Sequence, residues 1–138
     1  MKLIELLPAI EEKFDLNLLE SLEISNITSD SRKVSASGLF FAIQGEKFDG
    51  VNFTRMAEKR GAVIIITYSG GLKKCKELGV SIPIIEVENV RKVLSYAAYK
   101  WFGQQPKEIV AITGTNGKTS VAAFLKQIWE NLGIKCAS

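Results

Sequence analysis

The stretch IVAITGTNGKTS, residues 109–120, contains the pattern that decides the fold class. A β-branched run from Ile109 to Thr113 leads into a glycine loop, and an amphipathic helical pattern follows from Thr119 to Leu132. A phosphate-binding loop requires this context of strand, glycine-rich turn and helix. Because strand and helix patterns also alternate along the rest of the chain, the sequence predicts an α/β fold with a largely parallel sheet.

The residue types of this loop suit the phosphates of ATP. Gly114 and Gly117 allow the backbone to curl with its N–H groups pointing inward. The helix that begins near Lys118 adds the positive end of its dipole, and the Lys118 ammonium would neutralise the β- and γ-phosphates. The Thr119 hydroxyl is the predicted ligand of Mg²⁺. Lys118 is the predicted catalytic residue, and the predicted nucleotide-binding residues are Gly114, Thr115, Asn116, Gly117, Lys118, Thr119 and Ser120.

One position of the loop departs from the general nucleotide-binding pattern. GxxxxGK[ST] would place its first glycine at position 112, where this sequence has Ile112. The structural alternative is a turn that merely joins a strand to a helix. Lys118 argues against that alternative, because the helix dipole repels a cation in the first turn and a plain turn gains nothing from it.

Composition excludes several other classes of protein. The 138 residues are 46% hydrophobic and 24% charged with a net charge of +3, which is typical of a globular chain. No apolar run approaches the about 20 residues that cross a bilayer, and no export signal begins the chain, so we expect a cytoplasmic protein without membrane contact. The basic residues are scattered, and the group from Lys73 to Lys76 indicates a solvated helix face rather than a nucleic-acid surface. Histidine is absent, and Cys75 and Cys136 lack metal-site spacing.

Apolar runs and turn residues predict the elements upstream of the loop. We expect strands at 24–27, 39–43, 62–67 and 82–87, a helix within 2–14 that Pro8 shortens, and helices at 53–60 and between Asn89 and Gly103. The strand, loop and helix at the C-terminal end cannot bury their own apolar faces, so we expect further elements of their sheet, with another strand starting at 134.

Two polar turns follow predicted strands of the first domain. They are ITSDSRKV, residues 27–34, and the end of GLFFAIQGEKFDG, residues 38–50. Hydroxyls and free backbone N–H groups in such turns can hold a diphosphate, and Arg32 or Lys47 can balance its charge. Serine and aspartate are also ordinary turn formers, and Arg32 can instead pair with Asp30 or Asp49.

The string TGTNGKTS and the two upstream segments together resemble the Mur ligase family, whose members attach amino acids to a UDP-linked muramic acid in peptidoglycan synthesis. The superfamily that shares this loop also includes folylpolyglutamate synthases and cyanophycin synthetases. A folylpolyglutamate synthase fits less well, because a long segment with a UDP-pocket pattern precedes the loop here. The resemblance implies a small UDP-binding domain over 1–88 and the truncated start of a P-loop ATPase domain over 89–138. It also implies that the substrate-binding residues are Ser29, Ser31, Glu46, Lys47 and Phe48, with Ser29, Ser31 and Lys47 lining one cleft.

The pattern fits best the family branch that adds the third amino acid, meso-diaminopimelate or lysine, to UDP-N-acetylmuramoyl-L-alanyl-D-glutamate. In that family ATP phosphorylates the terminal carboxylate, and an amine attacks the acyl phosphate. The resemblance therefore implies an ATP-dependent acid–amino-acid ligase that uses Mg²⁺, of which these residues alone are inactive. The alternatives are the sibling ligase that adds the final dipeptide, which Thr115-Asn116 disfavours, and a non-catalytic nucleotide- or UDP-sugar-binding module.

Overall fold

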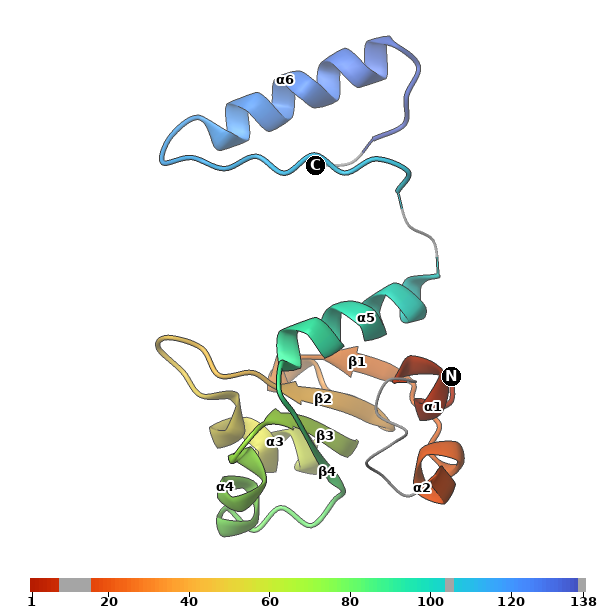
Figure 1. Cartoon of the computed structure of the whole chain (residues 1–138), viewed down its shortest axis with the longest axis vertical. Helices are drawn as coiled ribbons and strands as arrows, with labels where there is room; N and C mark the ends of the chain where they lie inside the picture. The colour runs from red at the N-terminus through yellow and green to blue at the C-terminus, as the bar shows by residue number, and fades with distance from the viewer. Residues whose placement is uncertain (8–15, 104–105, 137–138) are drawn as a thin grey trace. The chain divides into compact units, whose positions relative to one another are not determined.

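The computed structural model describes residues 1–7, 16–103 and 106–136. The chain divides into two compact units, Met1–Gln105 and Pro106–Ser138. Figure 1 shows the first unit as a sheet with helices on it, and the second as one helix with extended chain beside it. None of the helices in these ranges is long and apolar enough to cross a membrane.

A four-stranded parallel sheet is the centre of the first unit. Its strands are β1 (Asn26–Thr28), β2 (Gly38–Ala42), β3 (Ala62–Tyr68) and β4 (Ile84–Val87), and their order in the sheet is the order of the chain. All three pairings are parallel, and they place Phe41 beside Ile66 and Ile66 beside Ile85. Every residue of β2 is buried, as its unbroken apolar run requires of a strand covered on both faces. The predicted α/β class is confirmed.

Side chains that alternate along β2 and β3 enter two separate apolar cores. One core lies between the sheet and α1 (Leu3–Leu6) with α5 (Val90–Phe102), and the other lies under α3 (Thr54–Lys59) and α4 (Gly71–Glu77). Phe41 belongs to the first core and Phe40 to the second, and both are at most 1% exposed. The connections contain α2 (Leu16–Ser21) and two 3₁₀ helices, η2 (Ser31–Lys33) and η3 (Gly50–Phe53).

Most predicted elements of the first unit are confirmed within one or two residues. Helix α1 ends at Leu6, before Pro8, and the rest of the helix predicted within 2–14 lies outside the described residues except for Leu7, its C-cap. Helix α5 begins after Asn89, whose Oδ1 accepts a hydrogen bond from the backbone N–H of Lys92 at 3.0 Å. Gly103 ends that helix at a φ of 69°.

Helix α5 packs with the first compact unit. It buries Val90 and Ala97 in the same core as the buried residues of α1, β2 and β3. The two units divide between residues 105 and 106. The domain boundary after Glu88, which the family resemblance implies, stays a prediction.

In the described residues of the second unit, α6 (Lys118–Asn131) is the single regular element, which confirms the predicted helix. The strands predicted at Ile109–Thr113 and from Ile134 are wrong, since residues 106–117 and 132–136 form no strand. A parallel strand exists through hydrogen bonds to a neighbouring strand, and this range offers no such neighbour. The apolar face of α6 is correspondingly uncovered, with Phe124 64% exposed.

Candidate functional site

The glycine loop forms the turn that leads into α6. Gly114, at a φ of 146°, and Gly117, at a φ of 77°, adopt positive-φ conformations that glycine tolerates best. A Cβ atom at Gly117 would meet no atom within 4 Å, so conformation rather than space requires glycine there. Gly117 is the N-cap of α6 and no side chain caps this end of the helix, so its first N–H groups suit an anion.

Lys118 is exposed, and its ammonium folds back over this loop. It donates a hydrogen bond to the Gly114 carbonyl, and it lies 3.5 Å from the Thr115 carbonyl oxygen. Both partners are neutral. In the described ranges no carboxylate pairs with Lys118, since the ion pairs there are Arg32–Asp30, Lys74–Asp49 and Lys126–Glu130. The loop therefore holds an uncompensated positive charge beside an open helix N-terminus.

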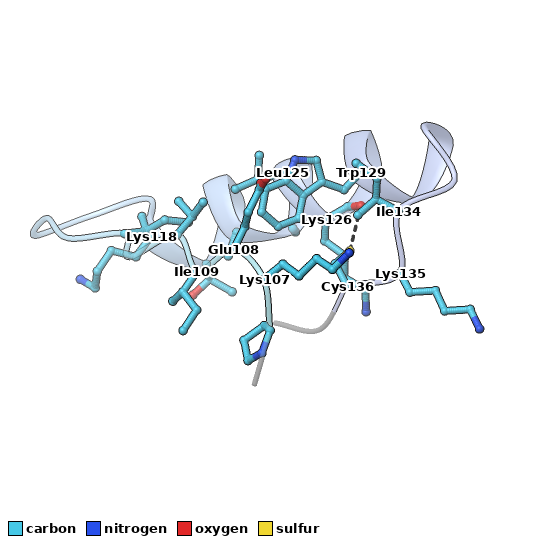
Figure 2. A pocket seen from close by; sticks show the side chains of 16 residues that line it. Lys107, Glu108, Ile109, Lys118, Leu125, Lys126, Trp129, Ile134, Lys135 and Cys136 are labelled. Carbon is cyan, nitrogen blue, oxygen red and sulfur yellow. Dashed lines mark hydrogen bonds between the residues drawn. The ribbon is translucent and has the colours of Figure 1, made fainter. Parts of the chain in front are cut away.

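A cavity of about 1140 Å³ lies beside this loop in the second unit. Figure 2 shows side chains of α6 and of the extended segment 106–112 lining it, with Lys118 towards one end. Apolar side chains such as Ile112, Leu125 and Trp129 form much of its wall, so the cavity suits packing against apolar chain better than binding of phosphate. Across the described residues no group of three or more acidic, histidine or cysteine side chains could hold a metal ion. Thr119 therefore remains the single predicted metal ligand of this segment.

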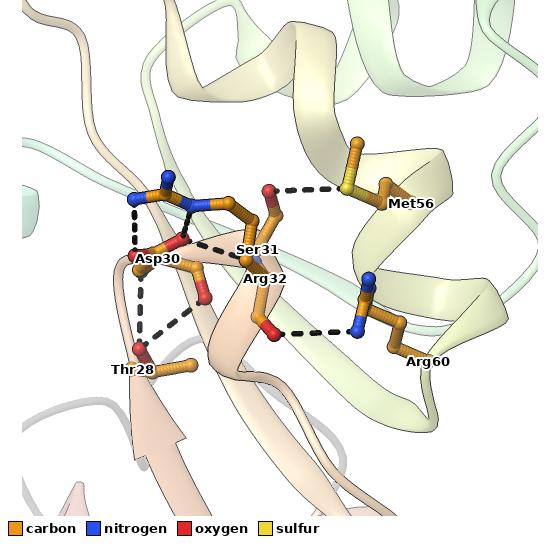
Figure 3. A network of polar contacts seen from close by, with 6 residues as sticks. All are labelled: Thr28, Asp30, Ser31, Arg32, Met56 and Arg60. Carbon is orange, nitrogen blue, oxygen red and sulfur yellow. Dashed lines mark hydrogen bonds and ion pairs between the residues drawn. The ribbon is translucent and has the colours of Figure 1, made fainter.

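The predicted substrate residues of the first unit follow the carboxyl ends of β1 and β2. Ligands of parallel α/β sheets bind at this edge. Ser29 is exposed there. Ser31 begins η2 and is only 7% exposed, and its hydroxyl lies 3.5 Å from the sulfur of Met56 on α3. Figure 3 shows the Ser31 hydroxyl pointing towards Met56. The cleft predicted to be shared by Ser29, Ser31 and Lys47 stays a prediction.

Arg32 pairs with Asp30, one of the two roles that the sequence left open. The two side chains form a bidentate pair, with Nε to Oδ1 at 2.9 Å and Nη2 to Oδ2 at 2.8 Å. The Arg32 backbone N–H also donates to Asp30 Oδ1 at 3.0 Å. Hydrogen bonds from the Arg32 side chain and backbone lower the pKa of Asp30 from 3.8 to about 2. The ion pair orders the turn after β1, and it already occupies the Arg32 guanidinium with a carboxylate.

Glu46, Lys47 and Phe48 form the exposed tip of the loop between β2 and η3. The Gly45 N–H donates to the Phe48 carbonyl at 2.9 Å, which closes the tip. Phe48 is 72% exposed, unlike the apolar residues of the adjacent strand. The tip thus presents an anion, a cation and an aromatic ring to solvent.

Residues 23–101 match the model described as Mur ligase family, catalytic domain. The chain belongs to the Mur ligase family. The family that the sequence motifs indicated is therefore confirmed.

Several relatives of this Mur ligase chain are named UDP-N-acetylmuramoyl-L-alanyl-D-glutamate--2,6-diaminopimelate ligase. The protein of that name from Chelativorans sp. (strain BNC1) is 49% identical over 115 residues, which are 83% of this chain and 23% of the relative. The one from Listeria monocytogenes serotype 4b (strain F2365) is 42% identical over 130 residues, which are 93% of this chain and 25% of the relative. The chain thus spans about a quarter of the length of the curated relatives it matches.

A solved structure of MurF ligase from Thermotoga maritima in complex with ADP has a similar fold. It matches with a TM-score of 0.56 and 27% identity, over 80% of this chain and 24% of that chain. The likeness agrees with a Mur ligase fold for these residues.

Sequence reasoning missed two residues beside the loop tip in this Mur ligase chain. Tyr68 and Lys74 both hydrogen-bond to Asp49, so Lys74 is not simply part of a solvated helix face. Asp49 was noted as a turn former and as a possible partner of Arg32. No local motif signals contacts between residues 19 and 25 positions apart.

Proposed function

We propose that this chain is part of an ATP-dependent ligase that adds meso-diaminopimelate to UDP-N-acetylmuramoyl-L-alanyl-D-glutamate in peptidoglycan synthesis. The observation that carries the proposal is the glycine loop, in which the unpaired Lys118 charge lies beside the uncapped N-terminus of α6. The names of relatives at 42–49% identity support this branch of the family. The ADP in the complex of the solved MurF ligase supports a nucleotide as ligand.

In this proposal the second unit binds ATP. Backbone N–H groups of residues 114–120 hold the phosphates, and the Thr119 hydroxyl contributes one ligand to Mg²⁺. Lys118 stabilises the charge on the transferred phosphoryl group, an electrostatic role that needs a mobile cation without a carboxylate partner. The described residues contain no group of three or more acidic, histidine or cysteine side chains that could hold a metal ion, so the proposal names no ligand besides Thr119.

The first unit, in the same proposal, binds the UDP part of the substrate. Lys47 is the cation proposed for the diphosphate, since the neighbouring cations Arg32 and Lys74 already pair with aspartates. Ser29, Glu46 and Phe48 complete the contact surface. Ser31 is also proposed to contact the substrate, although its hydroxyl lies 3.5 Å from the Met56 sulfur in this structure and the residue is only 7% exposed.

The sibling reaction, addition of a dipeptide to the UDP-tripeptide, is the second candidate, because the solved neighbour is a MurF ligase. One assay separates the two. The purified full-length protein with ATP and Mg²⁺ receives either the UDP-dipeptide with meso-diaminopimelate or lysine, or the UDP-tripeptide with D-alanyl-D-alanine. With the UDP-dipeptide and meso-diaminopimelate, we expect phosphate release and a product whose mass is that of the UDP-tripeptide ending in meso-diaminopimelate. Turnover only with the second pair, the UDP-tripeptide and D-alanyl-D-alanine, would assign the chain to the sibling branch.

We also propose a cytoplasmic location, since the reaction consumes ATP and a nucleotide-linked precursor. Cell fractionation with an antibody against the full-length protein tests this location, and recovery with the membrane pellet after a high-salt wash would contradict it.

A further inference from the structure

Three side chains from three different elements meet at the base of the Glu46–Phe48 loop tip. Asp49 Oδ2 accepts hydrogen bonds from the Tyr68 hydroxyl at 2.5 Å and from Lys74 Nζ at 3.2 Å. Lys74 Nζ also donates to the Tyr68 hydroxyl oxygen at 2.9 Å and lies 5.4 Å from the centre of its ring. Tyr68 is the last residue of β3 and Lys74 belongs to α4, so the cluster joins the loop to the carboxyl end of β3 and to α4.

Asp49 also organises the neck of this loop through its other oxygen and its backbone. Its Oδ1 accepts a hydrogen bond from the Val51 N–H at 3.1 Å and so caps η3. Asp49 forms an isolated antiparallel bridge with Gln44, and the Gly50 N–H donates to the Ile43 carbonyl at 2.9 Å. Movement of Asp49 would therefore move both ends of the tip.

The cluster is a charged network at neutral pH. Burial raises the pKa of Asp49, but hydrogen bonds from Tyr68, Val51 and Lys74 outweigh it, so the pKa is lowered from its ordinary value. Burial and the hydrogen bond to Asp49 raise the pKa of Tyr68, while its hydrogen bond from Lys74 opposes them. Asp49 is thus ionised, Tyr68 is protonated and Lys74 is charged. Hydrogen bonds with ionised partners are stronger than neutral ones, which suits the network to holding a loop.

We infer that Asp49, Tyr68 and Lys74 are positioning residues that hold the Glu46–Phe48 tip ready for the nucleoside diphosphate of the substrate. The inference rests on the proposed function, in which that tip contacts UDP. A loop that is ordered before binding loses less conformational entropy when the ligand arrives, so affinity rises without any new contact to the ligand. None of the three residues needs to touch the reacting atoms.

Two substitutions in the full-length protein test this inference. Tyr68→Phe removes the hydroxyl and keeps the ring, and Lys74→Met removes the charge and keeps the length of the chain. Each should raise the KM for UDP-N-acetylmuramoyl-L-alanyl-D-glutamate about five- to tenfold, the effect of losing about one hydrogen bond, and leave kcat within about twofold. Hydrogen exchange of the Gly45 and Gly50 amides should quicken in both variants without substrate. Lys74→Arg keeps a charged donor and should restore most of the affinity.

Glu58 provides a matched control in the same unit. It is a carboxylate that accepts hydrogen bonds from the Ser81 N–H at 2.9 Å, the Ser81 hydroxyl at 2.5 Å and the Ile82 N–H at 3.2 Å. These bonds tie α3 to the segment before β4 and do not involve the loop. Glu58→Gln should lower the melting temperature but leave the KM and the exchange of Gly45 and Gly50 unchanged.

The inference is overturned if Tyr68→Phe and Lys74→Met leave loop exchange unchanged, or if they quicken it without raising the KM. It is also overturned if Glu58→Gln raises the KM as much as they do. Failure of the proposed function gives a different result, because the wild-type protein would then not turn over the UDP-dipeptide at all. Exchange of the Gly45 and Gly50 amides needs no substrate, so it still decides whether the cluster holds the loop.

Discussion

Replacing Lys118 by alanine separates the chemistry of the glycine loop from its structure. Among the described residues, the ammonium hydrogen-bonds to the carbonyl oxygens of Gly114 and Thr115, and the residue is exposed. A substitution at such a surface position should change the free energy of unfolding by no more than about 0.5 kcal/mol. Loss of a preorganised charge that acts in the transition state should instead cost about 3 kcal/mol, a fall in kcat of about a hundredfold.

The assay is steady-state release of phosphate by the full-length Lys118→Ala variant, with calorimetric titration of the UDP-dipeptide and a denaturant melt. We expect kcat to fall about a hundredfold while the melt and UDP-dipeptide affinity stay near those of the wild type. Lys126→Ala is the matched control, because Lys126 is a lysine of the same helix whose nearest carboxylate, on Glu130, is 3.9 Å away. It should leave kcat unchanged. Near-normal kcat in Lys118→Ala would show that the glycine loop is only a structural turn.

Four further substitutions follow from the same structure. The added Cβ of Gly117→Ala meets no neighbouring atom, so the cost in unfolding free energy should be only that of a left-handed alanine, about 1–2 kcal/mol in denaturant melts. The same substitution should raise the KM for ATP. An unchanged KM would argue against phosphate binding by this turn. Asp30→Asn tests how the Asp30–Arg32 ion pair links stability to pH. Because the pKa of Asp30 is lowered to about 2 in the folded state, the ion pair stabilises the fold above pH 3.8, and its contribution is lost as pH falls towards 2. The melts of wild type and variant should therefore converge near pH 2. A gap that widens on acidification would contradict this pairing. Phe41→Ala should destabilise the first unit by about 3–5 kcal/mol, whereas Phe48→Ala should leave the melt unchanged and raise the KM for the UDP-dipeptide; the reverse pattern would refute the placement of both rings.

The strands of the sheet could be predicted because their local pattern coincides with their final environment. The run from Leu39 to Ile43 and that from Ala62 to Ile66 are continuously apolar, as strands covered on both faces must be. Asn89 and Gly103 mark the ends of α5 because capping is a contact within one turn of the helix.

Other features depend on partners that lie far away in the sequence. The run from Ile109 to Thr113 has the composition of a strand, but strand formation needs a neighbour that the described chain does not provide. The burial of Ser31 depends on Met56, 25 residues later. Turn composition alone could not separate Ser29, which is exposed, from Ser31, which is buried.

The order of the strands has a consequence for synthesis of the protein. Because each strand pairs with the one translated just before it, the sheet can grow by one strand at a time as the chain leaves the ribosome. Among the described residues of this unit, no strand has to wait, with its edge unpaired, for a partner made much later. Each loop closed at a pairing step is short, which keeps the entropic barrier to assembly low. The first unit is therefore suited to fold while residues 106–138 are still being made.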